Sequence, residues 1–143
     1  MTLFDKLARL DKAERSLLAE TAIVVPLVRV VLTVLPFRLV HRVIAAIPHR
    51  ARASESRTPE RIARMVAAVS ARVPRATCLT QALAATVLLT RHGHRSTLRL
   101  GVAKKEDGTL RAHAWLESGG RTLLGGPDSG AFTQLPPVAL SRR

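Results

Sequence analysis

The chain has 143 residues, almost half of them apolar, and a formal net charge of +13 that is carried mostly by arginine. This length fits one domain or two small subdomains, and the apolar content excludes wholesale disorder because it is sufficient for a real core. The charge raises nucleic acid, an anionic membrane surface or an acidic peptide as partners, but basic and aromatic residues are not interleaved as they are in proteins that stack nucleobases, so we expect no nucleic-acid partner.

The N-terminal third of the chain is predicted to be helical. Leucines at helical spacing predict an amphipathic helix over residues 3–20. An apolar stretch follows over residues 22–40, interrupted by Pro26, Arg29 and Pro36, and its longest uncharged run is shorter than the roughly 20 residues that span a bilayer. We expect one or two helices here that pack on the protein, on a partner or at a membrane surface, and a further short helix between Pro36 and Pro48.

The start of the chain also bears on its location. Residues 1–6 lack the basic-then-apolar order of a secretory signal. The single cysteine, Cys78, excludes an internal disulfide and suits a reducing compartment. We therefore expect a cytoplasmic protein.

A change of composition divides the chain. Residues 49–57 are small and polar and form the best candidate for a linker. Thr58-Pro59-Glu60 then predicts the start of a helix, with threonine as the N-cap, proline in the first position and an acid in the first turn. This pattern separates a helical region over residues 1–57 from a core over residues 58–143.

The next helix is predicted to begin at Cys78 and to end before Gly93, which suits the position after a helix. Thr77 is its N-cap. Cys78 then lies in the first turn, where unpaired backbone N–H groups and the positive end of the helix dipole favour a thiolate. A lone cysteine is more often a small buried hydrophobe, so a catalytic role depends on what folding brings beside it.

Two histidines, His92 and His94, lie at the end of this helix. Their charge complements the negative end of the helix dipole. Cysteine or carboxylate ligands are missing nearby, so we expect no metal site here and no cofactor elsewhere.

From residue 96 the periodicity changes from helical to alternating. Apolar residues alternate over the first strand, Asp107-Gly108 predicts a hairpin turn, residues 110–117 form its partner strand, and residues 121–124 return as a third strand. The tail from Gly125 is rich in glycine and proline and is expected to be irregular. Helices followed by a small antiparallel sheet predict an α+β fold.

The second strand carries a histidine. On an extended strand His113, Trp115 and Glu117 share one face, and the residues between them point the other way. If this strand lies against the start of the Cys78 helix, the imidazole can reach the sulfur. A thiolate would then attack a carbonyl, with His113 as general acid and base and the backbone N–H of Cys78 as the first oxyanion donor.

A third residue is needed to orient the imidazole. Asp128 is the only aspartate beyond His113 and is the first candidate. Glu117 is the alternative, although its place on the strand aims it away from the ring. Asp107 lies in the hairpin turn and is assigned to turn chemistry.

Several segments together resemble a known family. They are Cys78-Leu79, Ala82-Leu83-Ala84, Leu88-Leu89, Arg91-His92-Gly93, Leu98-Arg99-Leu100-Gly101-Val102 and Ala112-His113-Ala114-Trp115-Leu116-Glu117. These segments resemble the lasso-peptide maturation proteases, which are transglutaminase-like, papain-related cysteine peptidases. The resemblance covers residues 60–126 well, and Leu35-Pro36-Phe37-Arg38 resembles a proline-arginine segment that these proteins carry near their N-terminus.

The resemblance implies a papain/transglutaminase-like core in which a nucleophile helix packs on a small antiparallel sheet, with Cys78 as the nucleophile and His113 as the general acid–base. It implies a hydrolase that removes the leader from a ribosomally made lasso-peptide precursor, in antibiotic biosynthesis, before an ATP-dependent cyclase closes the ring. The family commonly places an acid near Gly125 or Gly126. Here either Asp128 replaces it through a different loop path, or the protein works with a dyad.

The resemblance also implies partners. In the split form of this family a small recognition protein grips the leader, and the basic, apolar region over residues 1–57 is a reasonable surface for docking that protein or the leader. The expected partners are therefore the precursor leader, the recognition protein and the lasso cyclase, and a membrane surface is a further candidate. Two other functions remain open: a related acyl-transfer enzyme of the transglutaminase or amidase type, and a non-enzymatic basic adaptor for nucleic acid or membrane.

Overall fold

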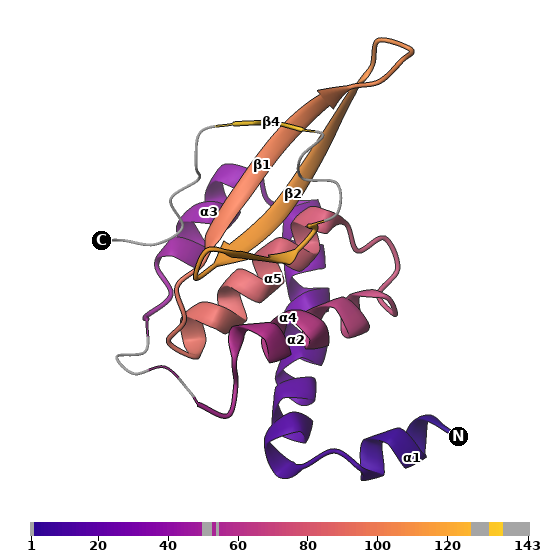
Figure 1. Ribbon diagram of the computed structural model, residues 1–143, viewed down its shortest axis with the longest axis vertical. Coiled ribbons are helices and arrows are strands. Elements are labelled where there is room, and N and C mark those ends of the chain that lie inside the picture. The colour runs from indigo at the N-terminus through magenta and orange to yellow at the C-terminus, as the bar shows by residue number, and fades with distance from the viewer. Residues whose placement is uncertain (1, 50–52, 54, 127–131, 136–143) are drawn as a thin grey trace.

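Helices pack against one face of a small antiparallel sheet in the computed structural model, which describes residues 2–49, 53, 55–126 and 132–135 (Figure 1). This arrangement confirms the α+β fold. The helices are α1 (Leu3–Ala8), α2 (Lys12–Val34), α3 (Phe37–Ala45), α4 (Pro59–Ser70) and α5 (Cys78–Arg91). The strands are β1 (Thr97–Lys104), β2 (Leu110–Ser118), β3 (Arg121–Leu124) and β4 (Thr133–Gln134), and their order in the sheet is β3-β2-β1-β4.

The expected single helix over residues 3–20 is wrong, because the chain breaks between α1 and α2. Asp11 is the N-cap of α2: its Oδ1 accepts a hydrogen bond from the backbone N–H of Glu14 at 2.7 Å. The Glu14 carboxylate accepts the N–H of Asp11 in return, at 3.2 Å. This reciprocal capping box starts a new helix at Lys12.

Helix α2 is also longer than expected. It continues through Pro26, because Val24, Val25 and Val28 pack into the core on both sides of the hydrogen bond that proline removes. By length and composition it is sufficient to cross a membrane, which differs from the expectation that the apolar run ends too early. Only 28% of its most apolar part is buried within the protein, and the rest of that part is partly or fully exposed.

The shorter helices follow the expected signals. Helix α3 lies between Pro36 and Pro48 as predicted. The backbone N–H of Arg61 donates to Oγ1 of Thr58 at 3.3 Å, which confirms the predicted cap of α4. Helix α5 ends just before Gly93, whose φ of 82° is the left-handed conformation that glycine adopts readily.

One hydrophobic core joins the helices to the sheet. Helix α2 packs against α4 and α5, and α5 packs against β1 and β2. Both predicted regions of the chain contribute side chains to this core, and its fully buried members are Val25, Ile62, Val66, Ala82, Leu83, Ala84, Ala85, Leu88, Leu89, Leu98 and Leu116. The core is therefore built mainly from aliphatic residues, as the shortage of aromatic residues requires.

Trp115 lies on the other face of the sheet. Its neighbours on β2, Ala114 and Leu116, pack into the helical core, whereas its own side chain is 1% exposed and is covered from the opposite side. A Cβ added at Gly101 of β1 would come within 2.9 Å of the indole and 2.8 Å of Phe132, so the side chains of Trp115 and Phe132 fill this space. The sheet thus separates two layers of packing.

Strand β4 was not expected. Its residues Thr133 and Gln134 pair antiparallel with Val102 and Gly101 of β1. The described part of the tail is therefore not wholly irregular, since it returns along the edge of β1 and brings Phe132 over Trp115. The predicted hairpin is confirmed: β1 and β2 pair along their lengths around Asp107-Gly108, and they extend beyond the helices in Figure 1.

A cluster of charged residues fastens the segment before α4 to the helices. The Glu20 carboxylate on α2 lies 2.9 Å from Nε2 of His92 and 3.3 Å from a guanidinium nitrogen of Arg57. The ring of His94 hydrogen-bonds to the backbone carbonyl of Arg57 at 2.6 Å. The two histidines after α5 therefore hold the end of the predicted linker.

Candidate active site

Cys78 is the first residue of α5, as predicted. The backbone N–H of Thr80 donates to Oγ1 of Thr77 at 3.3 Å, so the threonine caps the helix. The thiol is free and half-buried, and Cys78 packs at the edge of the helical core. A free thiol that keeps access to solvent at a helix N-terminus has the placement of a reactive cysteine.

His113 lies on β2, opposite Gly101 of β1. Its Nε2 is 2.9 Å from the backbone oxygen of Gly125, which can only accept, so the nitrogen donates. The imidazole stacks on Phe132 with ring centroids 5.0 Å apart, and on Trp115 with centroids 6.0 Å apart. One hydrogen bond and two ring contacts therefore fix the orientation of the imidazole.

The structure brings together the two elements that carry Cys78 and His113, because α5 packs against β2. Alternation along β2 places His113 on the face opposite Ala114, which packs into the helical core. No hydrogen bond joins the sulfur to the imidazole among the described residues. Strand β3 pairs with β2 only from Leu116 onward, and beyond this pairing the Gly125 oxygen lies 2.9 Å from Nε2 of His113. The direct approach of the two side chains remains a prediction.

The two candidates for the residue that orients His113, Asp128 and Glu117, differ in what the structure shows of them. Asp128 lies outside the described residues. The Glu117 carboxylate accepts hydrogen bonds from Nε of Arg99 at 3.1 Å and from Nε1 of Trp115 at 3.2 Å, and in the described chain it makes none with His113. Glu117 therefore supports the indole beside the imidazole.

Asp107 has the expected turn chemistry. Its Oδ1 accepts hydrogen bonds from the hydroxyl of Thr109 at 2.6 Å and from the backbone N–H of Thr109 at 2.9 Å. These two bonds, the hydroxyl first, lower the pKa of the Asp107 carboxyl below its ordinary value. Asp107 thus closes the hairpin.

Gly125 is the residue of the site that the sequence did not indicate. It has a φ of 75°, and a Cβ on it would lie 2.8 Å from the oxygen of Ala114, 3.0 Å from Cβ of Trp115 and 3.1 Å from Nε2 of His113. The contact with His113 uses a backbone oxygen, which every residue type has, so residue identity does not predict it. The available signal was the pair Gly125-Gly126 directly after the third strand, in the place where the resembled family carries an acid.

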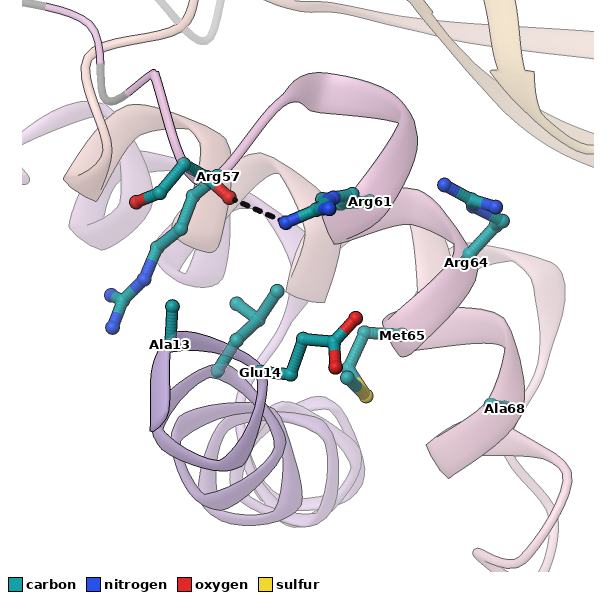
Figure 2. Close-up of a pocket in the computed structure, with 9 residues that line it drawn as sticks. Ala13, Glu14, Arg57, Arg61, Arg64, Met65 and Ala68 are labelled. Carbon is teal, nitrogen blue, oxygen red and sulfur yellow. Dashed lines mark hydrogen bonds between the residues drawn. The ribbon is translucent and has the colours of Figure 1, made fainter. Parts of the chain in front are cut away.

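A pocket of about 410 Å³ lies elsewhere, between the start of α2 and α4 (Figure 2). Leu17 and Met65 give it an apolar lining, and Arg57, Arg61 and Arg64 surround it. Two of the guanidinium groups are engaged: that of Arg61 donates to the oxygen of Ser56 at 3.2 Å, and that of Arg57 binds the Glu20 cluster. Neither Cys78 nor His113 lines this pocket, so it is separate from the candidate active site.

The described residues contain no group of three or more histidine, cysteine, aspartate or glutamate side chains placed to hold a metal ion. His92 and His94 instead serve the contacts with Glu20 and Arg57.

Comparison with known proteins identifies the family. Residues 22–136, well over half of the chain, match the family described as the transglutaminase-like superfamily. The chain belongs to this superfamily, whose members are in general cysteine-dependent enzymes that cleave peptides or transfer acyl groups. Neither the curated proteins nor the solved structures include a chain that matches this one.

Proposed function

We propose that this protein is a cysteine peptidase that removes the leader from a ribosomally synthesised lasso-peptide precursor in the cytoplasm. The observation that carries the proposal is the packing of α5 against β2. Helix α5 begins at Cys78, which is capped by Thr77 and only half-buried, and β2 carries His113, whose Nε2 is held by a hydrogen bond. Membership of a superfamily of cysteine-dependent enzymes supports the same chemistry. The choice of a lasso precursor depends on the resemblance of the Cys78 and His113 segments to the maturation proteases.

The reaction has two halves. The Cys78 thiolate forms a bond to the scissile carbonyl carbon, and the developing oxyanion is stabilised by backbone N–H groups at the start of α5. The C–N bond then breaks as the imidazolium of His113 gives its proton to the leaving amine, which leaves a thioester. In the second half His113 takes a proton from water, the hydroxide attacks the thioester, and Cys78 leaves as the thiolate.

A small leader-recognition protein is the proposed partner, and we place its docking surface on the α2 stripe, defined as Ile23, Leu27, Val30 and Val34. These residues recur at helical spacing and are between 57% and 72% exposed. An aliphatic row of this kind marks an interaction surface. The precursor would be delivered to Cys78 by this partner and passed on to the ATP-dependent cyclase.

The decisive experiment is cleavage of a cognate precursor by the purified protein with its recognition partner, followed by mass spectrometry. We expect the wild type to give two fragments whose masses sum to that of the precursor plus water. Cys78→Ala and His113→Ala should abolish cleavage. His49→Ala, which removes an exposed histidine of the predicted linker, is the matched control and should leave cleavage unchanged.

Two outcomes would reject the proposal. Cleavage that persists in Cys78→Ala or His113→Ala would exclude the assigned chemistry. A product in which the acyl part of the substrate is joined to an amine, rather than released by water, would assign the protein to the acyl-transfer branch of the superfamily.

A further inference from the structure

We propose that the backbone carbonyl of Gly125 is the positioning group for His113, in the place where a carboxylate side chain would be expected. This inference rests on the proposed function. The carbonyl accepts the Nε2 proton of the neutral ring, which leaves Nδ1 as the basic nitrogen that takes the proton from Cys78. The third member of the site is then a main-chain atom.

The first support is the hydrogen bond itself. The separation of 2.9 Å between Nε2 and the Gly125 oxygen is that of a well-formed N–H···O bond. A carbonyl has no proton to donate, so in the neutral imidazole the proton must reside on Nε2. A hydrogen bond at one ring nitrogen thereby sets the tautomer, and hence the nitrogen that acts as the base.

The second support is the packing that prevents the ring from turning. Phe132 and Trp115 stack with the imidazole at centroid distances of 5.0 and 6.0 Å. The indole is held in turn by the Glu117 carboxylate at 3.2 Å, and that carboxylate by Arg99 at 3.1 Å. The described candidate acid is thus engaged in holding the wall of the site, and among the described residues the Gly125 oxygen is the group that hydrogen-bonds to the imidazole.

The third support is the conformation of Gly125. Its φ of 75° is unfavourable for any residue with a side chain. A Cβ would also lie 2.8 Å from the Ala114 oxygen and 3.1 Å from Nε2 of His113. An alanine here must move the carbonyl away from the imidazole. Glycine is therefore required at the position that delivers the acceptor.

The chain offers two matched controls. Among the described residues, a Cβ at Gly126 would meet Thr122 at 3.4 Å, which is ordinary contact, and Gly126 has no positive φ. Gly120 has a φ of 77° but an added Cβ there would meet nothing within 4 Å. Gly126→Ala controls for an extra methyl group beside the site, and Gly120→Ala controls for left-handed backbone strain without any contact.

The test uses the full chain labelled with ¹⁵N-histidine, with the tautomer read at a pH at which the His113 ring is neutral. The His113 resonances are assigned by difference from His113→Gln, and their nitrogen shifts give the tautomer directly. We expect the Nε2–H tautomer in the wild type. In Gly125→Ala we expect this tautomer to lose its dominance, and the rate of alkylation of Cys78 by iodoacetamide at neutral pH to fall roughly tenfold or more. Gly126→Ala and Gly120→Ala should keep both the tautomer and the rate.

An Nδ1–H tautomer in the wild type would overturn the inference. So would a folded Gly125→Ala protein that keeps both the Nε2–H tautomer and the alkylation rate. If Gly125→Ala does not fold, the wild-type tautomer still decides. Failure of the proposed function would give a different result: the wild type would show the Nε2–H tautomer but would not cleave the precursor. That result would reject the peptidase assignment and leave the positioning of His113 by Gly125 intact.

Discussion

The side chain of Glu117 shows how a charged residue beside a candidate catalytic histidine can serve packing. Its carboxylate is shared between the Arg99 guanidinium and the Trp115 indole, and the indole forms part of the wall against which the imidazole rests. The negative charge is thereby neutralised by Arg99 at some distance along the strand from His113. A carboxylate in this arrangement shapes the site through the tryptophan.

Glu117→Gln separates this role from a direct one. Glutamine keeps an oxygen that accepts from the Trp115 indole and loses only the charge opposite Arg99, a partly exposed pair of small energetic value. We expect precursor cleavage to fall by less than about tenfold, far less than the 10²-fold or greater loss typical of removing a general acid–base group, the role proposed for His113. A loss as complete as that of His113→Ala, measured in the same assay, would make Glu117 the orienting acid.

Strand β1 contributes to the site through the absence of a side chain. Gly101 lies opposite His113, and the space that a side chain would take is filled by Trp115 and Phe132. The described end of the chain, β4, is paired to the same stretch of β1. Gly101, Trp115 and Phe132 thus form one packed layer that carries the imidazole.

Gly101→Ala tests this layer. A Cβ there would lie 2.8 Å from Cβ of Phe132 and 2.9 Å from the indole, and the indole is rigid and almost fully buried. We expect the free energy of unfolding to fall by about 1–3 kcal/mol, as in other overpacked sites. Urea denaturation followed by the fluorescence of the single tryptophan measures the change. Gly126→Ala is the control. Equal urea midpoints for the two variants would show that the packed layer accommodates the added methyl group without loss of stability.

The α2 stripe makes a prediction about assembly. Leu27→Gln combined with Val34→Gln places polar groups at exposed positions, so the free energy of unfolding should change by less than about 0.5 kcal/mol per substitution. Binding of the leader-recognition protein, measured by calorimetry, should be lost. If the double variant binds the recognition protein as well as the wild type does, the α2 stripe is not part of that interface. If the double variant instead loses binding to anionic lipid vesicles, the α2 stripe is a membrane-binding surface.

At the scale of the whole molecule, a single carboxylate connects three distant parts of the chain. Glu20 contacts His92 after α5, Arg57 before α4 and, at 3.3 Å, Nε of Arg91. The side chains of Glu20, Arg57 and His92 are 15%, 19% and 6% exposed, so their contacts are largely withdrawn from water, whereas Arg91 is 54% exposed. These contacts join the helical N-terminal region to the part of the chain that carries Cys78.

Glu20→Ala should therefore destabilise the fold. Removing Glu20 from this partly buried cluster leaves Arg57 and His92 without their acceptor, and we expect a loss of about 1–3 kcal/mol in the free energy of unfolding. Glu60→Ala is the control, because its pair with Arg121 is exposed on both sides and should contribute little. Chemical denaturation of both variants checks the difference, and equal stabilities would show that the cluster is not structural.

The parts of the fold that depend on local signals were predictable from the sequence. The caps at Thr58 and Thr77, the glycine after α5 and the hairpin at Asp107-Gly108 each express a preference of a few neighbouring residues. The position of Cys78 at the start of α5 followed from such a signal as well. The capping box at Asp11 was equally local, and its Asp-x-x-Glu pattern was overlooked beneath the run of leucines.

Features that depend on distant parts of the chain were not predictable. Strand β4 exists because Thr133 and Gln134 meet the edge of β1 more than 30 residues away. The burial of Trp115 on the second face depends on Phe132 in the same way, and the partner of His113 is a backbone oxygen that every residue type possesses. Residue identity carries no information about such contacts until the topology is known.

The hydrogen bond from His113 to Gly125 has a consequence for how the imidazole responds to its surroundings. An aspartate in that place would be protonated at low pH and would then no longer accept the hydrogen bond as a carboxylate. At higher pH, where it is ionised, its negative charge would favour the protonated, charged form of the imidazole. An amide oxygen does neither at ordinary pH, so the aim of the histidine is set by the path of the main chain. The imidazole then loses its orientation only when the turn after β3 itself unfolds.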